Sequence, residues 1–299
     1  MEQNKKKKFK SISKNKYGWF FVSIASLLII AFALFPILQA LVLSTESGKG
    51  LVTEFVGLGN YKRLFSDPMF ITALKNTFLF LIIQVPIMIL LSLVISKMLN
   101  NKKLKGKGFF RTAVFLPCVT SLVAYSVLFK SMFAVDGIVN TILMNLNFIQ
   151  NPIPWLLDPF WAKITIIIAI TWRWTGYNMI FYLAGMQNID SSIYEAAKID
   201  GASPITEFFK ITLPMLKPII LLTTITSTIG TLQLFDEVVN ITGGGPGNAT
   251  MTISQYIYNL SFKFTPNFGY AATVSFAIVV IVAILSFIQF KVAGDKDEK

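Results

Sequence analysis

Residues 72–99 read TALKNTFLFLIIQVPIMILLSLVISKML, a stretch whose charged residues, Lys75 and Lys97, lie near its two ends. A helix needs about 20 predominantly apolar residues to cross the hydrocarbon core of a bilayer. The stretch therefore predicts a membrane-spanning helix. Pro86 is compatible with this prediction, because neighbouring helices can satisfy the carbonyl group that a proline frees.

Five further stretches have the same character. The six predicted spans are roughly Gly18–Leu43, Thr72–Leu99, Thr112–Phe133, Phe160–Met186, Leu213–Ile241 and Tyr270–Val292. The chain is 54% hydrophobic and 14% charged, which leaves too few charged residues to cover a soluble domain of 299 residues. We therefore predict an all-α polytopic membrane protein with six transmembrane helices in contact with membrane lipid.

Basic residues between the spans predict the orientation. Most of the 27 Lys and Arg residues lie in the N-terminal segment, the second and fourth connections and the C-terminal tail. Because basic connections stay in the cytoplasm, residues 1–17 and 293–299 are predicted to be cytoplasmic ends that flank a transmembrane domain of residues 18–292. The apolar stretch Tyr17–Leu43 is too long for the core of a cleaved signal peptide, so we expect it to be retained.

The composition excludes several classes of function. The chain has no histidine and one cysteine, Cys118, which leaves no disulfide, no imidazole or thiolate metal site and no Ser-His or Cys-His nucleophile pair. The net charge of +12 comes from basic blocks between apolar stretches, so it does not indicate nucleic-acid binding. Residues 243–247 are rich in glycine but lack the lysine of a phosphate-binding loop. We expect no enzyme, and no cofactor, metal or nucleic acid bound by this chain.

The connection between the fourth and fifth spans, residues 188–210, predicts two short cytoplasmic helices. Ser192 and Glu195 form a capping-box signature for the first helix, and Gly201 is placed to end it. Ser203 precedes Pro204, which suits the first position of the second helix. The residues alone leave two interpretations open: an ordinary capped surface loop, or an element that docks a partner.

The same residues carry a family resemblance. Residues 194–202, YEAAKIDGA, followed by Phe208, Ile211, Leu213 and Pro214, resemble the EAA loop of ABC importer permeases. Further matching motifs are residues 242–250 (TGGGPGNAT), 269–272 (GYAA), 116–117 (LP) and 176–178 (GYN). From about Tyr17 to Val292, the chain resembles bacterial ABC sugar importer permeases of the maltose/oligosaccharide (carbohydrate uptake) family, in their larger-subunit type. Compared with the maltose permease, we expect it to lack the extra N-terminal spans and the large periplasmic insertion.

This resemblance implies the type I ABC importer permease fold and a role in binding-protein-dependent sugar transport. The chain would line half of a translocation path. Its expected partners are a second homologous permease subunit, two ATPase subunits that hold ATP and Mg, an extracytoplasmic sugar-binding protein or lipoprotein, and the sugar itself. The resemblance assigns ATPase coupling to Glu195, Ala196, Ala197, Asp200 and Gly201. Small alanines allow a close approach, and Glu195 suits a helix N-terminus.

Candidate path residues in the fifth span are polar. Ser227 and Thr231 share a helical stripe with Thr223 and Gly230, and Gln233 is a weaker candidate. By the resemblance, Ser227 and Thr231 lie at path positions. Tight helix packing is the alternative, because Gly, Ser and Thr are common at helix contacts in membranes.

Candidate residues in the fourth span are Trp172, Arg173, Tyr177 and Asn178. Aromatic faces suit sugar rings, although an aromatic packing cluster is an equal alternative. Arg173 lies near mid-span, where a cation costs at least about 2.5–3.5 kcal/mol. We expect it to face a cavity or a subunit interface, with Tyr177 on the same face. Residues 236–237 would lie ~15 Å beyond the middle of the fifth span, which makes them poor partners for Arg173 unless the helices are strongly staggered.

Candidate residues in the third span are Cys118, Leu122 and Tyr125, which follow a helical stripe. By the resemblance, Cys118 and Leu122 lie at path positions, and ordinary packing is the alternative.

Other cargoes and other classes of protein remain open from the residues alone. A polyol, glycerol phosphate or an acidic (uronic) sugar could use the same importer class, and Arg173 could meet an anionic substrate. A self-sufficient secondary transporter is less favoured, because the sequence offers no mid-span carboxylate as an ion relay. An intramembrane enzyme would lack catalytic groups.

Overall fold

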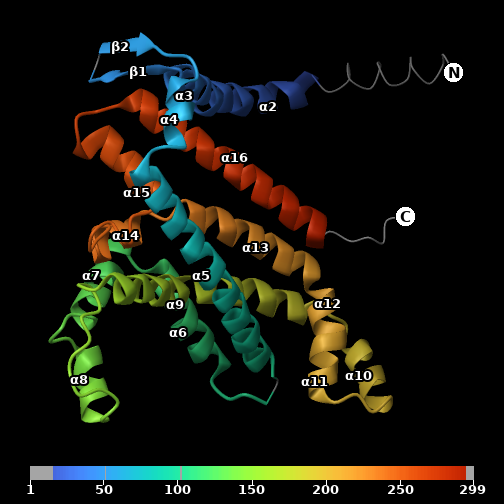
Figure 1. Ribbon diagram of the computed structural model, residues 1–299. Helices are drawn as coiled ribbons and strands as arrows, with labels where there is room; N and C mark the ends of the chain where they lie inside the picture. Colours follow the sequence, from blue (N-terminus) through green and yellow to red (C-terminus); the bar gives the residue numbers. More distant parts are fainter. Residues whose placement is uncertain (1–15, 51, 102, 294–299) are drawn as a thin grey trace, which may run out of the picture. The chain divides into compact units, whose positions relative to one another are not determined.

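The computed structural model describes residues 16–50, 52–101 and 103–293 (Figure 1). Their contacts divide them into two compact units. The first unit comprises the described residues up to Arg63 together with Leu260–Thr273, and the second comprises Leu64–Asn259 with the described residues from Val274 onward. Helices dominate both units, which confirms the all-α prediction, and the described residues add one small β-hairpin.

The first unit contains a long helical run and the hairpin. The run passes through α2 (Lys16–Ile29), the π-helical turn η1 (Ile30–Leu34) and α3 (Phe35–Ser44). Strand β1 (Glu46–Lys49) then pairs antiparallel with β2 (Val52–Phe55), and α4 (Gly59–Leu64) follows. The amide of Asn60 donates to the carbonyls of Ser44 and Glu46 at 3.0 and 2.7 Å, so α4 is tied to the end of α3.

The second unit is organised around α5 (Pro68–Asn100) and α9 (Pro159–Gln187). Both helices begin with an Asp-Pro pair. Asp67 and Asp158 accept hydrogen bonds from the first free backbone N–H groups, and the following proline needs no such partner. Helix α9 packs against α5, α6 (Lys107–Val119) and α13 (Lys217–Leu232) (Figure 1). These neighbours explain why α9 can bury polar side chains.

Two of the predicted spans are broken. Helices α6 and α7 (Leu122–Met132) meet at 100°. The short run α11 (Pro204–Glu207), η2 (Phe208–Thr212) and α12 (Leu213–Met215) meets α13 at 67°. Helix α13 then stops at Leu232, before the separate helix α14 (Asp236–Ile241). The expectation of a straight fifth span from Leu213 to Ile241 is therefore wrong.

By length and hydropathy, the described residues hold three helices able to cross a membrane and two bent pairs that qualify together. The three are Gly18–Ser44, Pro68–Asn100 and Phe268–Val292, the last within α16 (Phe268–Ala293). Helix α9 has 29 residues, enough to cross, but it is more polar than those three. Its polarity follows from its central position in the unit, where protein rather than lipid surrounds many of its side chains.

Two further short helices of the second unit are fixed by specific hydrogen bonds. Asn140 on α8 (Ile138–Asn145) donates to the carbonyl of Ile153 and accepts from the indole of Trp155 at 2.9 Å, which organises the connection to α9. Helix α15 (Ile253–Tyr258) is held on α5, because the Ile253 N–H donates to the Thr77 hydroxyl at 3.1 Å.

Candidate translocation cavity and coupling loop

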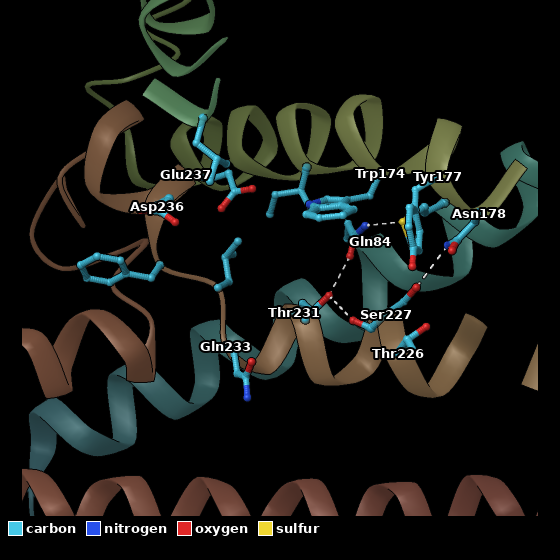
Figure 2. Close-up of a pocket in the computed structure, with 16 residues that line it drawn as sticks. Gln84, Trp174, Tyr177, Asn178, Thr226, Ser227, Thr231, Gln233, Asp236 and Glu237 are labelled. Atoms are coloured by element: carbon cyan, nitrogen blue, oxygen red, sulfur yellow. Dashed lines mark hydrogen bonds between the residues drawn. The ribbon is translucent and has the colours of Figure 1, made fainter. Parts of the chain in front are cut away.

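The second unit contains a cavity of about 340 Å³ between α5, α7, α9, α13 and the first residues of α14 (Figure 2). Its lining combines amides, hydroxyls, three aromatic side chains and two carboxylates. The lining residues are Gln84, Met88, Leu122, Ile170, Trp174, Tyr177, Asn178, Thr226, Ser227, Gly230, Thr231, Gln233, Leu234, Phe235, Asp236 and Glu237.

Hydrogen bonds connect the polar residues on one side of the cavity. The Asn178 amide donates to the Ser227 hydroxyl at 3.1 Å, and the Thr231 hydroxyl lies 3.1 Å from Gln84 Oε1 (Figure 2). Asn178 is 1% exposed, and its Oδ1 has no donor among the described residues. A buried acceptor left unpaired is costly, so this atom calls for a ligand or water donor.

Aromatic rings form the adjacent wall. Trp174 and Tyr177 pack edge to face with ring centroids 5.9 Å apart, and Tyr177 also contacts Phe181. Trp174 is half-buried, while Tyr177 is exposed. Rings with one free face can cover the apolar face of a sugar ring, and a Tyr or Trp polar edge can bond its hydroxyls.

Two carboxylates lie at the end of the cavity formed by the start of α14 (Figure 2). Asp236 is exposed, whereas Glu237 is 5% exposed and interacts with Trp174 and with the charge of Arg173. A straight fifth span would keep these acids away from Arg173, but the chain breaks after Leu232 and packs α14 against α7 and α9, which brings Glu237 within electrostatic range of Arg173.

Arg173 is not among the residues that line the cavity, so of the two predicted environments, a cavity or a subunit interface, the cavity is not the one it occupies. It is 5% exposed, and its guanidinium donates to the carbonyls of Pro117, Cys118 and Thr120 at 3.1–3.3 Å. These carbonyls lie where α6 ends and the chain turns into α7, so their helical partners are missing. Arg173 therefore caps the break, with its guanidinium carbon 4.9 Å from the Tyr125 ring centroid.

The other candidate path residues divide into two groups. Ser227, Thr231, Gln233, Tyr177, Asn178 and Leu122 line the cavity, whereas Trp172, Cys118 and Tyr125 lie outside its lining together with Arg173. Trp172 stacks on Tyr125 at 6.2 Å, and Tyr125 is buried in an aromatic and aliphatic core. Cys118 contributes its carbonyl to Arg173.

Sequence reasoning missed several lining residues. Gln84 is the plainest, because it is a lone amide in the apolar middle of α5 and a polar group there needs a partner. Asp236 and Glu237 also line the cavity, although the sequence argument gave them no role in the path.

The predicted coupling loop folds as α10 (Ser191–Ile199), a turn and α11. Gly201 ends α10 with φ +76°, a left-handed conformation that favours glycine. Ser203 caps α11 by accepting from the Thr206 N–H, with Pro204 following it. The expected capping box at Ser192 is wrong, because Asp190 is the N-cap of α10. Its bond from the Ser192 N–H holds the pKa of Asp190 below the usual range.

The loop presents an open surface but is anchored underneath. Glu195, Ala196, Asp200 and Gly201 are exposed, Ala197 is half-buried, and Ile199 and Ile205 are 87% and 69% exposed. The Tyr194 and Thr212 hydroxyls lie 2.9 Å apart, which links α10 to η2. Lys97, near the end of α5, donates to the Pro204 carbonyl at 3.2 Å and lies over the Phe208 ring. The loop is therefore attached to the long helix α5 and to η2, the segment that leads into α12 and α13.

Comparisons with known proteins show that this chain is similar to transport system permease proteins. The chain is 62% identical to a lactose transport system permease protein of Rhizobium radiobacter, over 93% of this chain and 94% of that protein. It is 32% identical to an arabinooligosaccharides transport system permease protein of Bacillus subtilis, over 94% and 90%.

Among solved structures, a chain of a bacterial ABC transporter involved in the import of the acidic polysaccharide alginate has the same fold. The TM-score is 0.84 at 21% identity, and the match covers 98% of this chain and 100% of that chain. The profile of binding-protein-dependent transport system inner membrane components matches residues 88–294, more than half of the sequence. The chain therefore belongs to the family of binding-protein-dependent transport system inner membrane components.

Proposed function

We propose that this chain forms half of the translocation path for a sugar or oligosaccharide in an ATP-driven importer, and that it couples the path to ATPase subunits through residues 188–210. The observation that carries the proposal is the cavity of the second unit. It combines amide and hydroxyl groups with exposed aromatic rings, the two kinds of contact that a saccharide needs.

The cavity chemistry supports a polyhydroxylated cargo. Sugar hydroxyls both donate and accept, so they can pair with Asn178 Oδ1 and with the hydroxyls of Ser227 and Thr231. Trp174 and Tyr177 offer the apolar faces. Because one relative is a lactose transport system permease protein, the disaccharide lactose is the first cargo to test.

The coupling loop supports separate ATPase partners. Glu195, Ala196 and the turn at Gly201 are free for contact, and the exposed isoleucines provide an apolar docking surface. A push on α10 would reach α13 through the Tyr194–Thr212 pair and η2, and α5 through Lys97. A rocking motion of the membrane helices would then open the cavity alternately to each side.

The complete assembly would contain a second homologous permease, two ATPase subunits that bind ATP and Mg, and an extracytoplasmic sugar-binding protein or lipoprotein. This chain would be a multi-pass protein of the bacterial cell membrane with both termini in the cytoplasm. The support is the excess of lysine and arginine in the connections on that side.

Co-purification from cells that express the neighbouring cistrons tests the proposal. A tag on this chain should recover a second six-helix protein and an ATPase. Changing Glu195→Lys together with Gly201→Val should lose the ATPase but keep the second permease. Ser192→Ala is the control, because Ser192 lies on the exposed helix α10 with Glu195 and contributes its backbone N–H, not its side chain, to the cap. Recovery of the chain alone, with uptake in ATP-depleted vesicles, would instead favour a secondary transporter.

A further inference from the structure

The charges in the cavity lie at one end and have one sign. Among the lining residues that the structure describes, Asp236 and Glu237 are the charged ones, and both are acidic. They begin α14, whereas Asn178, Ser227 and Tyr177 lie at the other end, with Trp174 between the two groups (Figure 2). A ligand held by the amide end and the rings would therefore extend toward two carboxylates.

An independent observation marks the cavity as a ligand site. Asn178 is almost completely buried, and its Oδ1 has no partner among the described residues. One N–H of its amide donates to Ser227. As an acceptor, Oδ1 can pair with a hydroxyl donor but not with a carboxylate.

The nearby cation does not reverse this preference. Arg173 donates to three backbone carbonyls at the α6–α7 break and lies outside the cavity lining. Its charge acts on Glu237, but Asp236 remains as a second acid at that end. An anionic substrate would meet the exposed Asp236 carboxylate at this end, where a neutral one meets acceptors for its hydroxyls.

We propose that Asp236 and Glu237 form a charge filter that admits neutral saccharides to the cavity and disfavours anionic ones such as uronates and aldonates. This inference rests on the proposed sugar-binding role of the cavity. It gives α14 a specificity function and excludes the uronic-acid cargo that Arg173 suggested from the sequence. Like charges about 4 Å apart repel by roughly 1–4 kcal/mol between bulk water and a protein surface, enough to discriminate.

Competition binding on the assembled importer tests the filter. Labelled lactose is bound to the purified complex in lipid, without the soluble receptor, and displaced by lactobionate or by lactobionamide. These two competitors have nearly the same size and differ in one negative charge. The wild-type complex should bind the amide about tenfold more tightly than the acid, which corresponds to about 1.4 kcal/mol. In Asp236→Asn/Glu237→Gln the ratio should approach one.

Controls separate the filter from general effects. Asp136→Asn removes one negative charge from an exposed turn after α7, away from the cavity lining, and should keep the wild-type ratio of the two affinities. If the double variant does not assemble, Asp236→Asn alone should still reduce the ratio, because this side chain is exposed and its replacement leaves packing intact. Equal displacement by acid and amide in the wild type would overturn the filter alone. Absence of displaceable lactose binding would overturn both the filter and the sugar-binding role.

Discussion

Replacing Arg173 by methionine should destabilise the break between α6 and α7. Methionine is similar in length but offers no donor. Three backbone carbonyls, those of Pro117, Cys118 and Thr120, would lose the hydrogen bonds that replace their helical partners. Glu237 would also lose the positive charge that acts on it.

The magnitude follows from the number of bonds. Hydrogen bonds between membrane helices average about 0.6 kcal/mol and reach about 1.7, so three bonds amount to roughly 2–5 kcal/mol. Breaking a buried charged contact from one side costs about 3–5 kcal/mol in soluble proteins, which is the same range. Arg173→Lys should fall between wild type and Met, because an ammonium group cannot reproduce the guanidinium fork.

Reversible unfolding in mixed micelles by SDS titration measures this free energy. Lys163→Met is the matched control, since it removes a half-buried cation from the same helix α9. The control should lose less than about 1 kcal/mol. If Arg173→Met lost no more than the control, Arg173 would not cap the break, and the account of how α9 holds α6 and α7 would be wrong.

Three further changes test other contacts. Gly176→Ala should cost about 1–3 kcal/mol in the same titration, because a Cβ there would overlap the Val114 carbonyl, whereas Gly108→Ala has open space and should cost nothing. Ser227→Ala removes the acceptor of the Asn178 amide and should raise KM for sugar uptake about fivefold, or about 1 kcal/mol, and an unchanged KM would remove this pair from the path. Asp190→Ala should reduce substrate-stimulated ATPase activity, and Asp190→Asn, which also caps, should preserve it. Because the pKa of Asp190 is lowered, the wild-type cap should persist from neutral pH until the pH falls through that depressed pKa, and coupling lost well above the usual Asp range would contradict this assignment.

Local signals in the sequence were sufficient for much of the coupling loop. The turn at Gly201 and the cap at Ser203 depend on residues within three positions of each other, so their chemistry can be read from the chain. The Asp-Pro starts of α5 and α9 are signals of the same local kind. Asp190 was missed because Ser192, with Glu195 three residues later, has the spacing of a capping box, whereas Asp190 is followed at that spacing by Ile193.

Hydropathy was enough to indicate that the protein lies in a membrane, because lipid requires long apolar helices. It does not report the direction of the backbone. A break in a helix leaves the composition of the span unchanged. The break at Thr120 turns α7 by 100° from α6, and the break after Leu232 brings Asp236 and Glu237 to the cavity.

The partners of the polar residues in the bundle depended on contacts between distant segments. Arg173 meets carbonyls more than 50 positions earlier in the chain, and Thr231 meets Gln84 across 147 positions. Sequence reasoning identified Arg173 as a residue that needs a partner, because a bare cation in lipid is too costly. Whether that partner was a substrate, an acid or the backbone depended on which helices pack around α9, and helix packing in a bilayer follows from side-chain shape and polar pairing across the whole bundle.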